Sequence, residues 1–322
     1  MTRKNLNLKL FEKAYLIRRA EEKIIEVYDS NEMKTPMHMS MGEEAIVSGV
    51  ASALSGLDLL FGTYRSHGLY LARSGDTFRF FSEMFGRESG VVRGKGGSMH
   101  LSDPDRGLVA TSAVVASTIP VAVGSAYALK KKGTRGVSAV FFGDGAIDEG
   151  SFWESLNMAS LFKLPVLFVC EDNGFAVHTP PALRHGYKSI SAIVSRFNCS
   201  VFSSTSTDAE VVFNLASRAK NAIFAKQTPA FIYLKYYRYL EHVGTHEDFS
   251  AGYRSQEEYQ KWLKVDPLKI LASKLKKLGV GKGELDKICK DIDLAVERSF
   301  KKARNSAFPN PAELYKNVFH EK

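Results

Sequence analysis

Two polar residues stand where two apolar segments end, and their types suit a metal and phosphate site. Asp144 lies between two glycines, directly after the apolar residues 138–142, and Asn173 follows the apolar residues 165–170. Carboxylate and amide oxygens are hard ligands of the kind that Mg²⁺ prefers, and Mg²⁺ usually shares them with phosphate oxygens. Glycines let a backbone approach a diphosphate closely. The pair therefore predicts a site for Mg²⁺ and a diphosphate.

The segment between these two residues indicates how they are positioned. Residues 149–162 carry apolar side chains at helical spacing, so the predicted order is strand, helix, strand. Parallel strands joined by such a crossover end at the same edge of a sheet, where open α/β sheets bind their ligands. Gly-Asp-Gly alone is common in ordinary turns. The prediction therefore depends on the spacing of Asn173 from Asp144 along the chain and on the helix predicted between them.

The remaining pattern predicts an α/β fold, with one domain over residues 1–322. An amphipathic helix is expected within residues 1–30, and a helical flank over residues 253–322. Further helices are expected at 43–54, 77–85, 119–132, 208–225 and 283–302. The alternation of strands and helices is expected to continue from 194–202 to a strand at 230–236. A short closing segment is expected at 309–319. The glycine-rich residues 87–100 predict a loop with unusual backbone angles or a close approach to a ligand.

Composition excludes several classes of protein. The hydrophobic content of 44% and the charged content of 25% are those of a globular protein. No apolar run is long enough to span a bilayer, and the first residues lack an apolar signal core, so a cytoplasmic location without a membrane partner is expected. The three cysteines are far apart and form no Cys-x-x-Cys pair, which argues against a disulfide framework and a zinc site.

The net charge of +9 raises nucleic acid as a partner. Much of the excess lies in short clusters at residues 130–132 and 274–282, at the ends of elements or on helical faces. No basic run is interleaved with aromatic residues, and no recognition motif accompanies the clusters. The charge therefore predicts solvated basic faces and no nucleic-acid partner, with part of it available to an anionic cofactor.

Six segments along nearly the whole chain resemble one family in their order. The chain is similar to the alpha subunit of the thiamine-diphosphate-dependent component of 2-oxo-acid dehydrogenase complexes, which include the pyruvate, branched-chain 2-oxo-acid and acetoin dehydrogenases. The segments are residues 64–68, 94–100, 143–173, 237–242, 266–267 and 308–315. The resemblance implies a thiamine-diphosphate-binding fold, with a mostly parallel sheet, helices on both faces and helical N- and C-terminal flanks.

The resemblance also implies roles at the diphosphate. Asp144 and Asn173 would ligate Mg²⁺, with the backbone carbonyl of Phe175 as a third ligand. Gly145 and Ala146 would donate backbone N–H groups to the diphosphate at a helix N-terminus. The side chains that would hold phosphate oxygens are those of Tyr64, Arg65 and Arg238.

At the other end of the cofactor, the backbone from Ala113 to Val115 would meet the aminopyrimidine ring. His67 and His242 would lie above the thiazolium ring, where the 2-oxo carbonyl reacts, and they are the predicted catalytic residues. His242 would also contact the cofactor. A histidine suits this position because it can hydrogen bond or transfer a proton near neutral pH.

The family obtains the carboxylate that meets the aminopyrimidine ring from a separate beta subunit. A chain of 322 residues is too short to hold both a diphosphate-binding and a pyrimidine-binding domain, so an obligate beta subunit in an α₂β₂ assembly is expected. The expected substrate is a small 2-oxo acid. The expected acceptor of the acyl group is a lipoyl-bearing acyltransferase.

Several alternatives remain open from the sequence. An acetoin dehydrogenase alpha subunit would carry the same segments. The diphosphate half of a split transketolase would share Asp144 and Asn173 but would lack segments such as residues 94–100. A subunit that binds the cofactor only for assembly would be catalytically silent, although the retained His67 and His242 argue against it.

A few residues depart from the family pattern. Val243 stands where some relatives carry a serine that kinases modify, so this mode of control is not expected. His178, His246 and Glu247 place polar groups in loops expected to border the site, which predicts a substrate with polar groups beyond the 2-oxo acid. His38, between two methionines, suits packing and catalysis equally.

Overall fold

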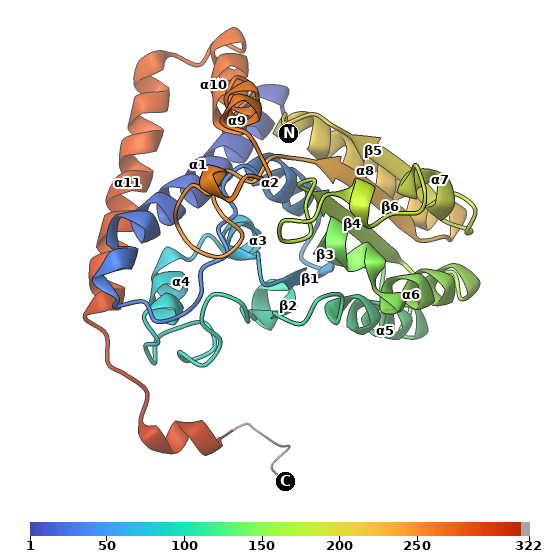
Figure 1. The fold of residues 1–322 in the computed structure, drawn as a ribbon, viewed down its shortest axis with the longest axis horizontal. Coiled ribbons are helices and arrows are strands. Elements are labelled where there is room, and N and C mark those ends of the chain that lie inside the picture. The colour runs from blue at the N-terminus through green and yellow to red at the C-terminus, as the bar shows by residue number, and fades with distance from the viewer. Residues whose placement is uncertain (317–322) are drawn as a thin grey trace.

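The computed structural model describes residues 1–316, and its centre is a six-stranded, all-parallel sheet of order β2-β1-β3-β4-β6-β5 (Figure 1). This confirms the predicted α/β fold with a parallel sheet. The strands are β1 (Leu59–Thr63), β2 (Leu108–Ser112), β3 (Ser138–Gly143), β4 (Val166–Asp172), β5 (Ser200–Ser204) and β6 (Ala230–Lys235). The predicted strands at 138–142, 165–170 and 230–236 correspond to β3, β4 and β6.

Helices flank the sheet and extend at both ends of the chain. They are α1 (Arg3–Val27), α2 (Glu44–Ala53), α3 (His67–Ser74), α4 (Thr77–Met84), α5 (Thr118–Lys131), α6 (Gly150–Leu161), α7 (Ile190–Val194), α8 (Ala209–Lys226), α9 (Gln256–Leu263), α10 (Pro267–Lys277) and α11 (Lys282–Arg304). The long helices that the apolar spacing predicted are present within a few residues of their expected bounds. The predicted first helix ends at Val27 and continues as a 3₁₀ turn, Tyr28–Ser30.

Side chains alternate between the two faces of the sheet, and helices cover both faces (Figure 1). In β3, Ala139 and Phe141 pack in a core with residues of α1, α2, α4, α8 and α11. Val140 and Phe142 pack on the opposite face with residues of α5, α6 and α7. A strand buried on both faces reads as a continuous apolar run, which is why β3 and β4 were recognisable in the sequence.

Two strands and two short helices were not predicted from the sequence, namely β1, β2, α3 and α7. Gly62 explains part of this, because a Cβ at this position would lie 2.4 Å from the Ser66 hydroxyl oxygen. The glycine that weakened the strand pattern therefore allows the chain to turn closely into α3.

The glycine-rich segment 87–100 wraps around a buried carboxylate of the protein itself. Glu83, at the end of α4, is 1% exposed. Its Oε2 accepts hydrogen bonds from the N–H groups of Val92 and Gly94 at 2.9 and 3.0 Å. Its Oε1 accepts from Gly96 and Gly97 at 2.7 and 3.1 Å. The expected unusual backbone angles are present, since Gly94 and Gly97 have φ of 76° and 58°.

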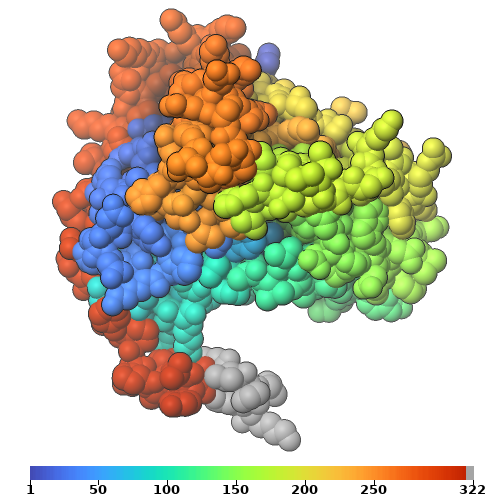
Figure 2. Space-filling model, in the orientation of Figure 1, coloured from blue at the N-terminus to red at the C-terminus, as the bar shows by residue number. Residues whose placement is uncertain are grey.

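The C-terminal helices confirm the predicted helical flank. α11 lies along α1, where Asp293 and Glu297 pair with Arg19 and Lys23 at 2.9 and 2.8 Å. Beyond α11, a 3₁₀ turn (Pro311–Tyr315) lies in the segment that projects from the helical body (Figure 2). Residues 317–319 of the predicted closing segment lie outside the described residues. Over residues 1–316, no helix is both long enough and apolar enough to span a bilayer.

Candidate active site

The predicted site residues follow the carboxyl ends of neighbouring parallel strands. Tyr64 follows β1, Asp144 follows β3 and Asn173 follows β4. From β1 the chain continues to β2 on one side, whereas β3 lies on the other side and continues to β4. The strand order therefore reverses between β1 and β3, and open α/β sheets bind ligands in the crevice at such a switch point.

A cavity of about 290 Å³ lies at this switch point. Most of the residues predicted to bind a cofactor line it together: Tyr64, Arg65, Val115, Asp144, Gly145, Ala146, Asn173, Phe175 and His242. Two of the predicted cofactor-binding residues do not line it. Ala113 lies directly after the end of β2, and Arg238 is buried behind His242, with its Nη1 3.3 Å from the His242 Nδ1.

Asp144 has the burial and charge expected of a cation ligand. Its side chain is only 3% exposed, and its Oδ1 is buried without a hydrogen-bond partner among residues 1–316. Its Oδ2 accepts a hydrogen bond from Arg184, in the loop after β4. Burial, with Asp172 nearby, raises the pKa of Asp144 to about 6. A buried carboxylate with an unpartnered oxygen is a costly group unless a cation satisfies it.

The other two predicted metal ligands line the same cavity as Asp144. The Asn173 Oδ1 accepts a hydrogen bond from the Phe175 N–H at 3.1 Å, and its Nδ2 lies 3.4 Å from the Tyr236 hydroxyl. No cluster of three His, Cys, Asp or Glu side chains in the described part of the chain is arranged to hold a metal. A metal at this position would therefore depend on carboxylate, amide and main-chain oxygens, the donor set of Mg²⁺ with a phosphate.

Close packing shows why glycine follows Asp144. A Cβ at Gly145 would lie 2.9 Å from the Ala176 Cβ, so a side chain would close the space between the two loops. Gly145 and Ala146 form the first turn of a 3₁₀ helix, Asp144–Asp148, rather than the start of α6. N–H groups in the first turn of a helix have no acceptor within the helix, so they suit an anion in this cavity. The cavity therefore fits a diphosphate with its metal ion.

Arg65 and His242 line this cavity, and the buried Arg238 lies against His242. Arg65 is 6% exposed, and it donates to the Met39 carbonyl at 2.7 Å and to the His242 carbonyl at 3.0 Å. Arg238 is 2% exposed and donates to the Leu240 carbonyl at 3.0 Å. Burial, and then the charges of Arg65 and Arg238, lower the pKa of His242 to about 3. His242 is therefore a neutral ring at neutral pH, a weak base that can form hydrogen bonds.

His38 belongs to the same group, which the sequence left undecided. Its ring lies 4.5 Å from the Tyr64 ring and 5.4 Å from the His242 ring, between centroids. Its Nδ1 is buried without a hydrogen-bond partner among the described residues. A bridge pairs His38 with Gly244 and so brings the two loops together. No local pattern in the sequence could have found this contact.

His67 occupies a different place from the one expected. It is fully buried at the start of α3, and its Nδ1 lies 3.0 Å from Glu21 Oε1 and its Nε2 2.7 Å from Ser98 Oγ. It is not among the residues that line the cavity. Both ring nitrogens already have protein partners, so the ring links α1 to the glycine-rich loop. The predicted catalytic role of His67 has no support from this position.

The polar residues expected to border the site separate into two groups. His178 stacks on Tyr253 with the ring centroids 4.4 Å apart, and Tyr253 in turn contacts Phe175. His246 is 66% exposed and lies 3.7 Å from Asp29 at the surface, and Glu247 is exposed as well. His178 thus lies beside the cavity, whereas His246 and Glu247 do not line it, and their place at the border of the site stays a prediction.

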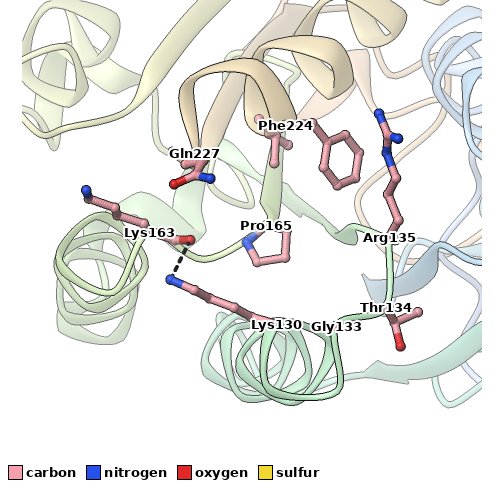
Figure 3. Close-up of a pocket in the computed structure, with 9 residues that line it drawn as sticks. Lys130, Gly133, Thr134, Arg135, Lys163, Pro165, Phe224 and Gln227 are labelled. Carbon is pink, nitrogen blue, oxygen red and sulfur yellow. Dashed lines mark hydrogen bonds between the residues drawn. The ribbon is translucent and has the colours of Figure 1, made fainter.

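A second cavity, of about 440 Å³, lies on the opposite edge of the sheet and holds none of the predicted site residues (Figure 3). It lies where α5, α6 and α8 end, beside the amino ends of β4 and β6. Figure 3 shows Lys130 donating to the Lys163 carbonyl, and the Lys130 ammonium also lies 2.7 Å from the Phe162 carbonyl. The Lys130 ammonium thus satisfies carbonyls at the C-terminal end of α6, where a basic side chain is favoured.

Comparison with known proteins agrees with this geometry. Residues 12–312 match the dehydrogenase E1 component family, and the chain belongs to that family. This confirms the resemblance to thiamine-diphosphate-dependent enzymes that act on 2-oxo acids.

Two relatives show the range of named activities. The alpha subunit of the pyruvate dehydrogenase E1 component of Zymomonas mobilis is 33% identical over 313 residues, 97% of this chain and 88% of that protein. The alpha subunit of an acetoin:2,6-dichlorophenolindophenol oxidoreductase of Bacillus subtilis is 30% identical over 311 residues, 96% of this chain and 92% of that protein. The chain therefore matches nearly the full length of both kinds of relative.

Proposed function

We propose that this chain is the alpha subunit of a thiamine-diphosphate-dependent 2-oxo-acid dehydrogenase, which decarboxylates a 2-oxo acid oxidatively and transfers the acyl group to a lipoyl group. The observation that carries the proposal is the convergence of Tyr64, Asp144, Asn173 and His242 on one cavity at the switch point of the sheet. An acetoin dehydrogenase alpha subunit is the second candidate, because the Bacillus relative is nearly as similar as the Zymomonas relative.

The protein residues have separable tasks in this proposal. Asp144, Asn173 and the Phe175 carbonyl hold Mg²⁺, and Gly145 and Ala146 donate N–H groups to the diphosphate. When bound, thiamine diphosphate supplies a nucleophilic carbon that adds to the 2-oxo carbonyl and stores the electron pair left by CO₂. The side chains that complete the cradle of the diphosphate are Tyr64 and Arg65, which line the cavity, whereas the predicted contact of Arg238 has no place in it.

His242 is the residue that we assign to the reacting carbonyl. Its pKa of about 3 keeps the ring neutral at neutral pH, so it acts through hydrogen bonds rather than as a general base. Arg238 Nη1 lies 3.3 Å from its Nδ1, which positions a permanent cation behind the ring. Nδ1 then accepts from the guanidinium, so Nε2 carries the ring proton and can donate a hydrogen bond to the oxygen of the reacting carbonyl.

The names of the relatives as alpha subunits support a partner beta subunit. We infer an α₂β₂ assembly in the cytoplasm, with a lipoyl-bearing acyltransferase as the acceptor. Val115 supports a cofactor that lies between subunits, because this residue of the cavity wall is 46% exposed. A beta subunit seated here would exclude water from the reacting carbon.

Reconstitution tests the proposed function. The chain and its cognate beta subunit are mixed with Mg²⁺ and thiamine diphosphate, and oxidation of pyruvate, branched-chain 2-oxo acids and acetoin is followed with an artificial electron acceptor. We expect turnover of at least one of these compounds that requires both subunits and the cofactor. Turnover without thiamine diphosphate, or by the chain alone, would contradict the proposal.

A further inference from the structure

A tight turn at the rim of the cavity presents one side chain to the cavity and the next to a neighbouring loop. Ala176 and Thr179 close the turn with two backbone hydrogen bonds, of 3.0 and 2.9 Å. Between them, Val177 lines the cavity with a φ of 56°, a conformation that β-branched residues rarely adopt. Such strain persists where surrounding contacts hold the backbone in place. The next residue, His178, supplies a contact of this kind.

His178 stacks on Tyr253, which lies in the loop before α9. The ring centroids are 4.4 Å apart and the ring planes differ by 29°, which is a favourable geometry for two aromatic rings. The Phe175 ring meets the same tyrosine edge-on, with the centroids 4.9 Å apart and the planes at 82°. The segment after β4 is therefore joined to a loop far along the chain through one aromatic ring.

The Tyr253 hydroxyl connects this stack to the proposed reaction centre. It accepts a hydrogen bond from Arg238 and donates one to Asp248. Arg238 is 2% exposed, and its Nη1 lies 3.3 Å from the His242 Nδ1. The guanidinium thereby fixes which nitrogen of His242 carries the ring proton. A displacement of Tyr253 would therefore move the donor that orients His242.

The two ends of Tyr253 are held differently. At its polar end, Asp248 also accepts a hydrogen bond from the Arg254 Nε at 2.7 Å, and Arg254 donates to the Leu240 carbonyl at 2.9 Å. The ring itself is half-buried, and the exposed His178 covers one part of it. A small residue in place of His178 would uncover the ring and leave the buried polar contacts intact.

We propose that His178 is a positioning residue for the reaction at His242. Its stack on Tyr253, called the clasp below, joins the turn of residues 176–179 to the loop of residues 248–254 and so keeps Arg238 against the His242 ring. His178 acts through ring contacts in this role and recognises no group of the substrate. The inference rests on the proposed function, because it assigns His242 to the reacting carbonyl.

A rival role for His178 is a hydrogen bond to a polar group of the substrate, as the sequence predicted. The two roles respond differently to substitution. His178→Phe keeps a ring that can stack and removes the ring nitrogens, whereas His178→Ala removes both. His246→Ala is the matched control, since the His246 side chain is 66% exposed and lies against Asp29.

Steady-state kinetics of the complex reconstituted with the beta subunit, Mg²⁺ and thiamine diphosphate give the first test. We expect His178→Ala to lower kcat and kcat/KM equally, by about tenfold, because a misplaced group at the reacting carbonyl costs rate without weakening binding. His178→Phe should stay within about twofold of the wild type, since it keeps the stack. His246→Ala should match the wild type. A normal rate in His178→Ala, or an equal loss in His178→Phe, would overturn the proposal.

The same kinetics with several 2-oxo acids separate the rival role. Under our proposal, the ranking of substrates by kcat/KM is the same in the wild type and in both variants of His178. A loss confined to substrates with additional polar groups, and shared by His178→Phe, would show that His178 recognises the substrate and would refute the positioning role.

A double-mutant cycle tests the route through Tyr253. Tyr253→Leu removes both the ring of the clasp and the hydroxyl that holds Arg238. In this background, His178→Ala should cause no further loss of kcat, because residues that act through one contact are not additive. Losses that add in the double variant would exclude this route.

Hydrogen exchange in the loop of residues 248–254 gives a readout that needs no turnover. The Ala251 and Gly252 amides donate within this loop to the Asp248 and Phe249 carbonyls, at 3.0 and 3.1 Å. In the assembled complex, His178→Ala should speed their exchange by about tenfold, and His178→Phe should not. Wild-type turnover with equal exchange in all three proteins overturns only the clasp. Failure of the wild type to bind thiamine diphosphate overturns the proposed function, and the role at His242 with it.

Discussion

At the scale of single residues, the site combines a buried carboxylate, Asp144, with two buried arginines that lower the pKa of His242. Asp144 is held in a place where burial raises its pKa to about 6, and a bound cation would stabilise its charge. His242 lies beside Arg65 and Arg238, which with burial lower its pKa to about 3. The same cavity thus contains a carboxylate that favours a cation and a histidine that stays neutral. This separation suits a metal-bound anion on one side and a neutral, hydrogen-bonding ring on the other.

His242→Ala should leave cofactor binding intact and lower turnover about 10²–10³-fold, which is the usual cost of removing one hydrogen-bond donor to a developing oxyanion. The reason is that its ring meets the reacting carbonyl in our assignment, while the diphosphate has other donors. Steady-state kinetics of the reconstituted enzyme and titration with thiamine diphosphate measure the two effects. His246→Ala, on the exposed surface next to Asp29, should match the wild type. A His242→Ala enzyme with a normal rate and lost cofactor would contradict the assignment.

The buried Glu43 carboxyl should make the stability of the protein depend on pH. It is fully buried, both its carboxylate oxygens lack a partner among the described residues, and burial raises its pKa to about 8. Because the folded pKa lies above the unfolded one, its stabilising contribution is complete below about pH 4.3 and is lost as the pH rises toward 8.

Glu43→Gln should therefore raise the free energy of unfolding at pH 8, by on the order of 1–3 kcal/mol, and change it less at pH 5. Denaturant unfolding at the two pH values measures the difference. Glu154→Gln, on the exposed face of α6, serves as the control and should show no such dependence. An equal change at both pH values for Glu43→Gln would show that its ionisation does not matter.

At the scale of elements, a few buried polar residues fix the loops that surround the site. Glu83 gathers four backbone N–H groups of the glycine-rich segment. Ser98, at the end of this group, contacts His67, which contacts Glu21 on α1. A chain of polar contacts thus ties α4, the glycine-rich loop, α3 and α1 together. These residues are needed for the shape of the site without touching the cavity.

Glu83→Gln should destabilise the protein by about 2–4 kcal/mol, because a neutral amide accepts fewer and weaker hydrogen bonds and leaves buried N–H groups unsatisfied. Urea unfolding measures this loss. Glu88→Gln, which removes an exposed pair with Arg93 in the same loop, should change stability by less than about 0.5 kcal/mol. Similar small effects of the two changes would show that the loop does not depend on Glu83.

Some of the elements around the site could be predicted from the sequence and others could not, for physical reasons. β3, α6 and β4 have uninterrupted apolar patterns, so the place of Asp144 and Asn173 could be predicted. β1 was missed because Gly62 is required for close packing and interrupts its pattern. Likewise, the position of His67 depends on partners that lie far away in the chain, Glu21 and Ser98. Contacts of this kind leave no periodic signal.

At the scale of the whole molecule, apolar residues are exposed around the cavity and along two helices. Val114 is 66% exposed at its rim, and Val121 on α5 is 53% exposed. Leu161 at the end of α6 is 70% exposed. Such residues would be costly on a protein that acts alone, and they suit a partner that covers the cofactor. The extent of the single predicted domain over residues 1–322 stays a prediction.

The isolated chain should self-associate, and the beta subunit should suppress this association by covering the apolar surface. Light scattering and sedimentation of the chain alone and of the mixture measure the effect. We expect polydisperse species without the partner and one species with the mass of an α₂β₂ assembly with it. A monodisperse monomer that is fully active alone would contradict the subunit assignment.

Calorimetric titration of the assembled complex with Mg²⁺ and thiamine diphosphate tests the central claim most directly. The account predicts one binding event for each alpha subunit, and its loss in Asp144→Ala by several kcal/mol, because the variant removes the carboxylate of the metal site. Asn173→Ala should weaken binding less, since an amide oxygen carries no net charge. Near-normal affinity of the Asp144→Ala complex would contradict the assignment of this cavity as the cofactor site.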